Sequence, residues 1–138
     1  MTPTAATLGR KLYADHARLA ALFADVLERL ARNDIEETAA AWNEFSRGLL
    51  DHLEMEERDI LPAFGKLHPA EADAILADHA KFRARLTELD IAVDLHFIRA
   101  DVAEEFISSL REHAERENRL MYAWADANVP VRAEAVHP

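Results

Sequence analysis

Apolar residues recur at three- and four-residue steps along four long segments of this chain of 138 residues. Such spacing places them on one face of an α-helix, where they can be buried together. The segments are rich in Ala, Leu, Glu and Arg, which favour helices, and only 3 Gly and 5 Pro are present to interrupt them. The sequence therefore predicts an all-α fold.

Prolines and capping signals give the expected helix boundaries. The first helix is expected to start within Thr2-Pro3-Thr4, and the next segment, Asn33-Asp34-Ile35-Glu36, is typical of a capping box. Pro62 is expected to disturb or end the second helix, and Asp101 is expected to cap the fourth, which could also begin at Leu95. The four helices are expected over about 2–32, 33–61, 69–94 and 101–127.

Short connections between helices place consecutive helices side by side and antiparallel. We therefore expect an up-down-up-down four-helix bundle over residues 1–128. The remaining residues, 129–138, are expected to form a short tail, because they carry little apolar surface to bury.

Composition excludes several functional classes. The chain has no cysteine, so disulfides, thiolate catalysis and iron–sulfur ligation are excluded, and any metal must be held by histidine or carboxylate. A net charge of −10 disfavours nucleic acid and anionic membranes as partners. No apolar run reaches the roughly 18 residues of a membrane span, so a cytoplasmic protein is expected.

Histidine and glutamate occupy positions in the apolar stripes where hydrophobic residues are expected. Each stripe contains one histidine, and the second and fourth stripes also contain a glutamate four residues later. Counting residues to each turn, at about 1.5 Å per residue, puts the four histidines at one level in the middle of the bundle. The inward polar residues are His16, His52, Glu56, His79, His113 and Glu117.

Neighbouring residues are assigned by the same periodicity. The fourth stripe is expected to continue inward through Leu120. Tyr13 and Met121 lie within one turn of His16 and Glu117. They are expected to contribute ordinary core packing, with lining of the metal pocket as the alternative. A solvated face is expected to carry the glutamates that fall outside the stripes, namely Glu54, Glu57 and Glu115.

Two carboxylates buried among four imidazoles require compensating cations, because an unpaired buried charge costs several kcal/mol. Imidazole suits iron, zinc, copper and nickel, whereas a carboxylate is a hard ligand that can bridge two ions. Six ligands also exceed the four that one zinc usually takes. The inward residues therefore predict a site for two metal ions. Ferritin-like di-iron sites need Glu-x2-His, but the residues three before the inward histidines are Tyr13, Leu49, Leu76 and Leu110. Zinc hydrolases need His-Glu-x-x-His, which the chain lacks.

The segments His52-Leu-Glu-Met-Glu56 and His113-Ala-Glu-Arg-Glu117, preceded by the single histidines His16 and His79, resemble the hemerythrin-like (HHE cation-binding) family over nearly the whole chain. The resemblance implies a non-haem di-iron centre in a four-helix bundle. Glu56 and Glu117 would bridge the two irons alongside an oxo or hydroxo group, and the four histidines would supply terminal nitrogens.

The ligand set differs from that of the oxygen-carrying hemerythrins. Those proteins have a second histidine four residues after the one on the third helix, where this chain has Arg83, and their fourth helix carries His-x4-Asp. The set of four histidines and two glutamates is instead similar to that of di-iron proteins implicated in repairing iron centres after nitrosative or oxidative stress.

The resemblance implies a protein that binds or reacts with O2, NO or peroxide at an open iron position. A second hypothesis is a non-catalytic helical interaction module, whose inward histidines are hydrogen-bonded or hold a single structural metal. Manganese or zinc in place of iron is left open. So are the oligomeric state and whether the small ligand is carried, sensed or turned over.

Overall fold

The computed structural model describes residues 8–128, which are helical almost throughout and contain no β-strand. The predicted all-α class is therefore confirmed. The expected helix start at Thr2-Pro3-Thr4 and the expected tail over 129–138 lie outside the described residues. The elements are α1 (Leu8–Ala31), α2 (Ile35–Asp59), α3 (Leu61–Leu67), α4 (Pro69–Asp94), α5 (Ala100–Glu117), η1 (Asn118–Tyr122, a π-helical turn) and α6 (Ala123–Asn128).

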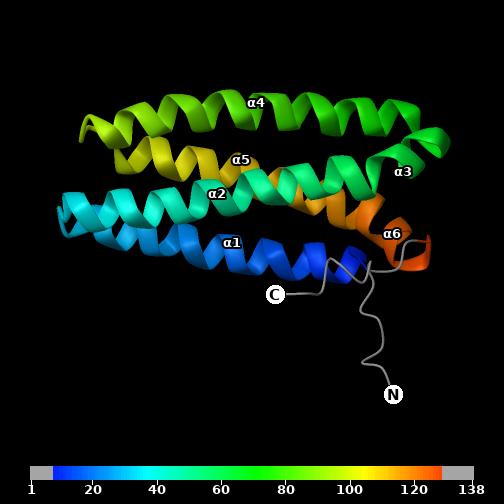
Figure 1. The fold of residues 1–138 in the computed structure, drawn as a ribbon, viewed down its shortest axis with the longest axis horizontal. Helices are drawn as coiled ribbons and strands as arrows, with labels where there is room; N and C mark the ends of the chain where they lie inside the picture. The colour runs from blue at the N-terminus through cyan, green and yellow to red at the C-terminus, as the bar shows by residue number, and fades with distance from the viewer. Residues whose placement is uncertain (1–7, 129–138) are drawn as a thin grey trace, which may run out of the picture.

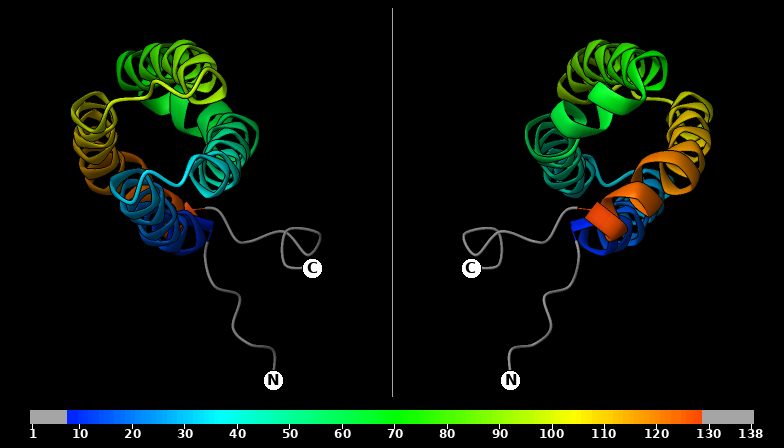
Figure 2. Two further views of the ribbon diagram at one scale, coloured as in Figure 1. Left: turned by 90° about the vertical axis from the view of Figure 1, so that its left-hand side faces the viewer. Right: turned by 90° about the vertical axis from the view of Figure 1, so that its right-hand side faces the viewer.

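The four long helices α1, α2, α4 and α5 form a bundle. They lie side by side along the long axis of the molecule, and each runs opposite to the long helix before it (Figure 1). Viewed along that axis, the four helices surround a common centre (Figure 2). Helix α3 forms the connection between α2 and α4, and η1 with α6 continues α5 beyond Glu117.

Helix boundaries differ from the sequence expectations by one or two residues at two caps. The N-cap of α2 is Asp34, not Asn33, and its carboxylate accepts a hydrogen bond of 3.0 Å from the backbone N–H of Glu37. Asn33 instead has a φ of 57° in the preceding turn, a conformation that asparagine adopts more readily than most residues. The N-cap of α5 is Arg99, so Asp101 lies inside the first turn, where a negative charge is favourable.

Pro62 marks a real break between α2 and α3. Helix α2 ends at Asp59, and Ile60, with φ −118°, separates it from α3. Proline lacks a backbone N–H, which the first turn of a helix does not need, and Pro62 lies in the first turn of α3. The predicted disturbance at Pro62 is confirmed.

The apolar core consists of two clusters that lie on either side of the polar mid-section of the bundle. The larger cluster, built around Trp42, Phe45 and Phe106, fills the end near the α1–α2 turn. The smaller cluster, which includes Ile60 and Met121, fills the end near α3 and α6. Polar groups between them are separated from solvent at both ends of the bundle.

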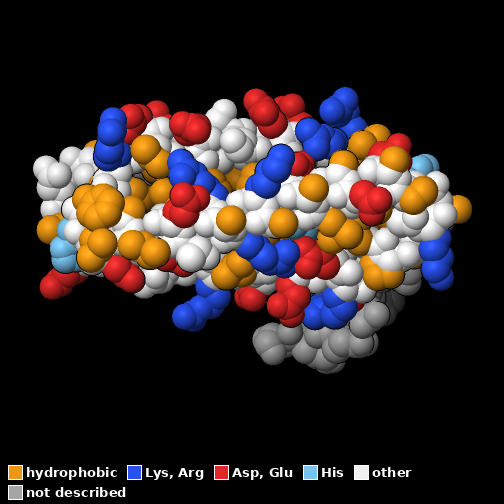
Figure 3. Space-filling view, turned by 90° about the horizontal axis from the view of Figure 1, so that it is seen from above, with side chains coloured by type: hydrophobic (Ala, Val, Ile, Leu, Met, Phe, Trp, Pro, Cys, Tyr) orange, Lys and Arg blue, Asp and Glu red, His pale blue; other side chains and the backbone are white. Residues whose placement is uncertain are grey.

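The surface is charged and mixed. On the face shown in Figure 3, Lys and Arg side chains alternate with Asp and Glu side chains, and hydrophobic side chains gather at the left-hand end. Exposed apolar residues at the turn between α4 and α5 include Ile91, Leu95 and Phe97. None of the helices within residues 8–128 has the length and apolar character needed to cross a bilayer.

Replacing Phe45 with alanine tests the larger cluster. Phe45 is fully buried, and its ring lies 4.9 Å from that of Phe23 and 5.6 Å from that of Trp42, centroid to centroid. Phe45→Ala is expected to lower the free energy of unfolding by about 3–5 kcal/mol, because it leaves a cavity. Denaturant unfolding measures this. The control Phe97→Ala, at a side chain 60% exposed, is expected to change stability by less than about 0.5 kcal/mol, and equal losses in both variants would contradict the assigned core.

Candidate metal centre

The structure brings together all six inward polar residues expected from the sequence. They form two overlapping groups of potential metal ligands, within each of which one donor atom per residue lies within 4.8 Å of the others. One group consists of His16, His52, Glu56 and Glu117, and the other of Glu56, His79, His113 and Glu117. Five of the six residues are buried, and the His16 side chain is 18% exposed.

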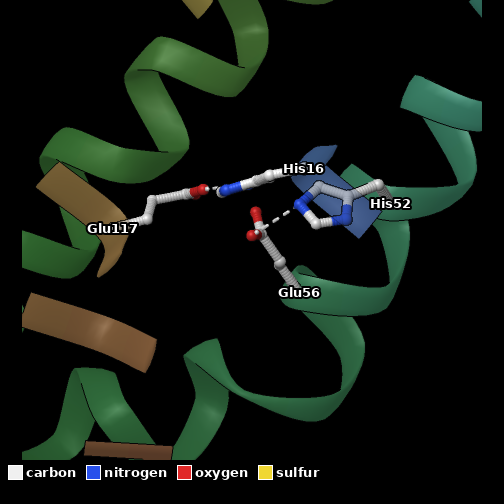
Figure 4. A group of neighbouring side chains, drawn as sticks. All are labelled: His16, His52, Glu56 and Glu117. Carbon is white, nitrogen blue, oxygen red and sulfur yellow. Dashed lines mark ion pairs between the residues drawn. The ribbon is translucent and has the colours of Figure 1, made fainter. Parts of the chain in front are cut away.

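In the first group, each histidine faces one glutamate. Nε2 of His52 lies 3.0 Å from Oε2 of Glu56, and Nε2 of His16 lies 3.5 Å from Oε1 of Glu117. Figure 4 shows Glu117 extending from one side toward His16, with His52 and Glu56, both on α2, next to this pair. The four inner atoms therefore surround a common point between α1, α2 and α5.

In the second group, the same glutamates use their other oxygens. Oε1 of Glu56 lies 3.0 Å from Nε2 of His79, while Oε2 of Glu117 lies 3.2 Å from Nε2 of His79 and 2.6 Å from Nε2 of His113. Each carboxylate thus presents one oxygen to each pair of histidines. This is the arrangement that a carboxylate needs to span two metal positions.

Carboxylates outside the cluster hold the outer nitrogens of three histidines. Nδ1 of His79 lies 2.7 Å from Glu57, Nδ1 of His113 lies 2.9 Å from Asp78, and Nδ1 of His52 lies 3.4 Å from Asp15. A carboxylate at Nδ1 fixes the imidazole ring and turns the lone pair of Nε2 toward the cluster, as is typical of metal-binding histidines. His16 differs, because its buried Nδ1 has no hydrogen-bond partner.

Two of these outer carboxylates are supported by arginines. Arg83 donates hydrogen bonds of 2.7 and 2.9 Å to Glu57, and Arg116 donates one of 2.8 Å to Asp78. The expectation that Glu57 belongs to a solvated face was therefore wrong. Its position on α2 is off the buried stripe, but it reaches across to His79 on α4.

Sequence reasoning also missed Asp15 and Asp78. Each lies one residue before a predicted ligand, but each contacts a histidine on another helix: Asp15 contacts His52, and Asp78 contacts His113. An acidic residue adjacent to a predicted histidine was the available signal. Periodicity along one helix does not reveal a partner on the neighbouring helix.

Burial and charge pairing have opposite effects on the pKa values of the clustered residues. Burial alone would lower the pKa of His52, but Glu56 and Asp15 outweigh it and raise that pKa to about 9. The pKa of His79 is likewise raised, to about 10, because hydrogen bonds to Glu117 and Glu56 outweigh burial. Burial would raise the pKa of Glu117, yet hydrogen bonds from His113, His16 and His79 hold it well below its usual range. Metal uptake must therefore displace imidazole protons.

A tyrosine that the sequence analysis did not assign lies inside the first group. The π-helical turn η1 inserts an extra residue after Glu117, so the inward positions become Met121 and Tyr122. Leu120, expected to be inward, is instead 42% exposed, so that expectation was wrong. The Tyr122 hydroxyl lies 2.9 Å from Nε2 of His16 and 2.9 Å from Nε2 of His52, and it donates to Glu56.

A cavity of about 340 Å³ opens beside the cluster between α1, α2 and α5. Its walls are largely apolar, and its inner end reaches His16, His52, His113 and Glu117. Tyr13 is 59% exposed and lies on this cavity wall, so it lines the pocket, the alternative given for it, and does not pack in the core. The apolar wall residues include Ala17, Ala20, Leu49, Leu53, Leu110 and Ala114.

Two features of the cluster suit a bound metal ion. Glu56 is completely buried, and its Oε1 makes no hydrogen bond although Nε2 of His79 is 3.0 Å away. A buried carboxylate oxygen without a partner is costly, and a cation would satisfy it. In addition, imidazole nitrogen together with carboxylate oxygen suits iron, manganese and zinc.

Asp78→Asn tests whether the outer carboxylates support the cluster. The change keeps the shape of the side chain but removes the charge facing Nδ1 of His113, so the affinity for a divalent metal is expected to fall about 10- to 100-fold. Competition with a chelator measures this. Asp73→Asn, the same change at an exposed position of α4, is the control. Equal affinities in the two variants would show that Asp78 has no part in the site.

Comparison with known proteins bears on the same cluster. A family model, the hemerythrin HHE cation binding domain, matches residues 7–125. Searches of curated proteins and of solved structures gave no significant match. The matched range includes all six clustered residues and the helices that carry them. The chain therefore belongs to the hemerythrin HHE cation-binding domain family.

Proposed function

We propose that the protein binds two iron ions and that this centre binds or reacts with O2, NO or peroxide. The observation that carries the proposal is the placement of Glu56 and Glu117, each of which presents one oxygen to either pair of histidines. In this proposal both glutamates bridge the two metal positions. His16 and His52 are terminal ligands at one position, and the other position has His79 and His113.

The chain's own residues prepare the donors. The carboxylates of Glu57, Asp78 and Asp15 hold three imidazole rings with Nε2 directed inward, so little reorientation accompanies metal binding. The apolar clusters at both ends of the site keep bulk water from the ligands. A bound di-iron centre supplies redox chemistry and open positions for a small ligand.

The cavity between α1, α2 and α5 supports a small neutral ligand over a charged substrate. Its exposed wall is largely apolar and includes Ala17, Leu49 and Leu110, while Arg111 and Glu115 also line it. It reaches His16 and Glu117 from the surface. O2 and NO match this lining best, and peroxide is small enough to enter.

A role in the response to oxidative or nitrosative stress, including repair of iron centres, is the proposed physiological context. The ligand set supports this over oxygen carriage. At the position where oxygen-carrying hemerythrins have a further histidine, Arg83 forms an ion pair with Glu57 and is not a metal ligand. Two imidazoles, not three, therefore face the second metal position.

Substitution of the two glutamates tests the proposal. Glu56→Leu and Glu117→Leu are each expected to abolish loading with two irons, because each removes an oxygen from both positions. The control Glu54→Leu changes an exposed glutamate of α2 and is expected to load normally. Metal per chain is measured after anaerobic incubation with Fe(II). The Leu variants are expected to stay folded without metal, because a buried charge has been replaced by an apolar side chain.

The same samples test the ligand chemistry. Exposure of the Fe(II)-loaded protein to O2 is expected to produce the absorption of an oxidised, oxygen-bridged di-iron centre, and the two Leu variants are expected to remain colourless. Unchanged metal content in the Leu variants would overturn the bridging roles. Full loading of the unaltered protein, with no spectral change on addition of O2, NO or peroxide, would favour a structural metal in an interaction module.

A further inference from the structure

Tyr122 is placed where an iron ligand would have to be. Its phenolic oxygen lies 2.9 Å from Nε2 of His16, 2.9 Å from Nε2 of His52 and 3.2 Å from Oε1 of Glu117, and it also contacts Oε2 of Glu56. These four atoms are the inner atoms of the first group of ligands. A cation held by that group would therefore lie within bonding reach of the phenolic oxygen.

The backbone is specialised to place this side chain. An uninterrupted α-helix after Glu117 would turn positions 120 and 121 inward, three and four residues on. The π-helical turn Asn118–Tyr122 adds one residue, so Tyr122, five residues after Glu117, reaches the cluster. Isolated π-helical turns are uncommon and occur frequently at functional sites.

The hydroxyl has more polar neighbours than it can hydrogen-bond. A phenol has one proton to donate and two lone pairs, yet this buried oxygen has four polar neighbours, of which two are carboxylates. If its only role were packing, phenylalanine would fill the same volume without burying a polar atom.

Tyr122 also has no better position to move to when a metal binds. Its side chain belongs to the smaller apolar cluster, together with Leu12, Ile60 and Phe64. If the ring swung away from the ligands, the hydroxyl would enter this apolar region and lose its hydrogen bonds, which is unfavourable. The packing that places the ring against His16, at 5.1 Å between ring centroids, therefore keeps the oxygen facing the cluster.

We propose that the phenolic oxygen of Tyr122 is a ligand of the iron held by His16 and His52. This inference rests on the proposed di-iron function. On coordination the O–H bond is replaced by an O–Fe bond, and the phenolic proton passes to solvent; no electron is transferred. The two metal positions are then inequivalent, because the His16 and His52 position has one oxygen donor more than the His79 and His113 position.

Resonance Raman spectroscopy of the iron-loaded, air-oxidised protein tests the assignment, because a phenolate bound to Fe(III) gives a visible charge-transfer band and enhanced ring vibrations. The chain has only 2 tyrosines, Tyr13 and Tyr122, so the source can be assigned completely. Tyr13→Phe is the control, since the Tyr13 side chain is 59% exposed. The band and the ring modes are expected to persist in Tyr13→Phe and to vanish in Tyr122→Phe, with iron per chain retained.

A second sample keeps the test decisive if Tyr122→Phe does not fold or load. Tyr13→Phe protein prepared with ring-deuterated tyrosine contains label at Tyr122 alone, and its ring modes are expected to shift. Absence of phenolate modes in protein that carries two irons would overturn the role of Tyr122 and leave the di-iron proposal intact. Failure of the unaltered protein to bind iron would instead overturn the proposed function.

Discussion

Two carboxylates buried in the middle of a helical bundle are the constraint on which this structure depends. Glu56 and Glu117 are almost completely excluded from solvent, and an unpaired charge in such a place costs several kcal/mol. Histidines from α1, α2, α4 and α5 surround them, so every long helix contributes to the compensation. The proposed irons complete it, since cations satisfy oxygens that imidazole leaves only partly bonded.

The surrounding structure serves this polar centre. Two apolar clusters close the bundle above and below it, and outer carboxylates orient three of the imidazoles. Arg83 and Arg116 donate hydrogen bonds to two of these carboxylates, Glu57 and Asp78 respectively. The clustered histidines, the proposed metal ligands, are thus held by carboxylates, and two of these carboxylates are in turn held by arginines. The largely apolar cavity between α1, α2 and α5 reaches the cluster from outside.

Helical periodicity predicted the bundle and all six clustered residues, because each is a departure from an otherwise apolar stripe. The same periodicity gave wrong expectations for Leu120 and Glu57. Leu120 was expected inward because the pattern assumes 3.6 residues per turn, and the π-helical turn at η1 brings Tyr122 inward instead. Glu57 was assigned to solvent because its partner, His79, lies on another helix. Contacts between helices and local changes of pitch are decided by packing, which one helix's sequence does not display.

The number of metal ions per chain tests the proposed di-iron centre. Protein made in iron-supplemented cells and purified without a metal-affinity tag would be analysed by mass spectrometry for metal and by amino-acid analysis for protein. Two metal positions that share both glutamates predict about two irons per chain. A single zinc, or no metal in a protein that also fails to bind Fe(II) anaerobically, would contradict the proposed di-iron centre.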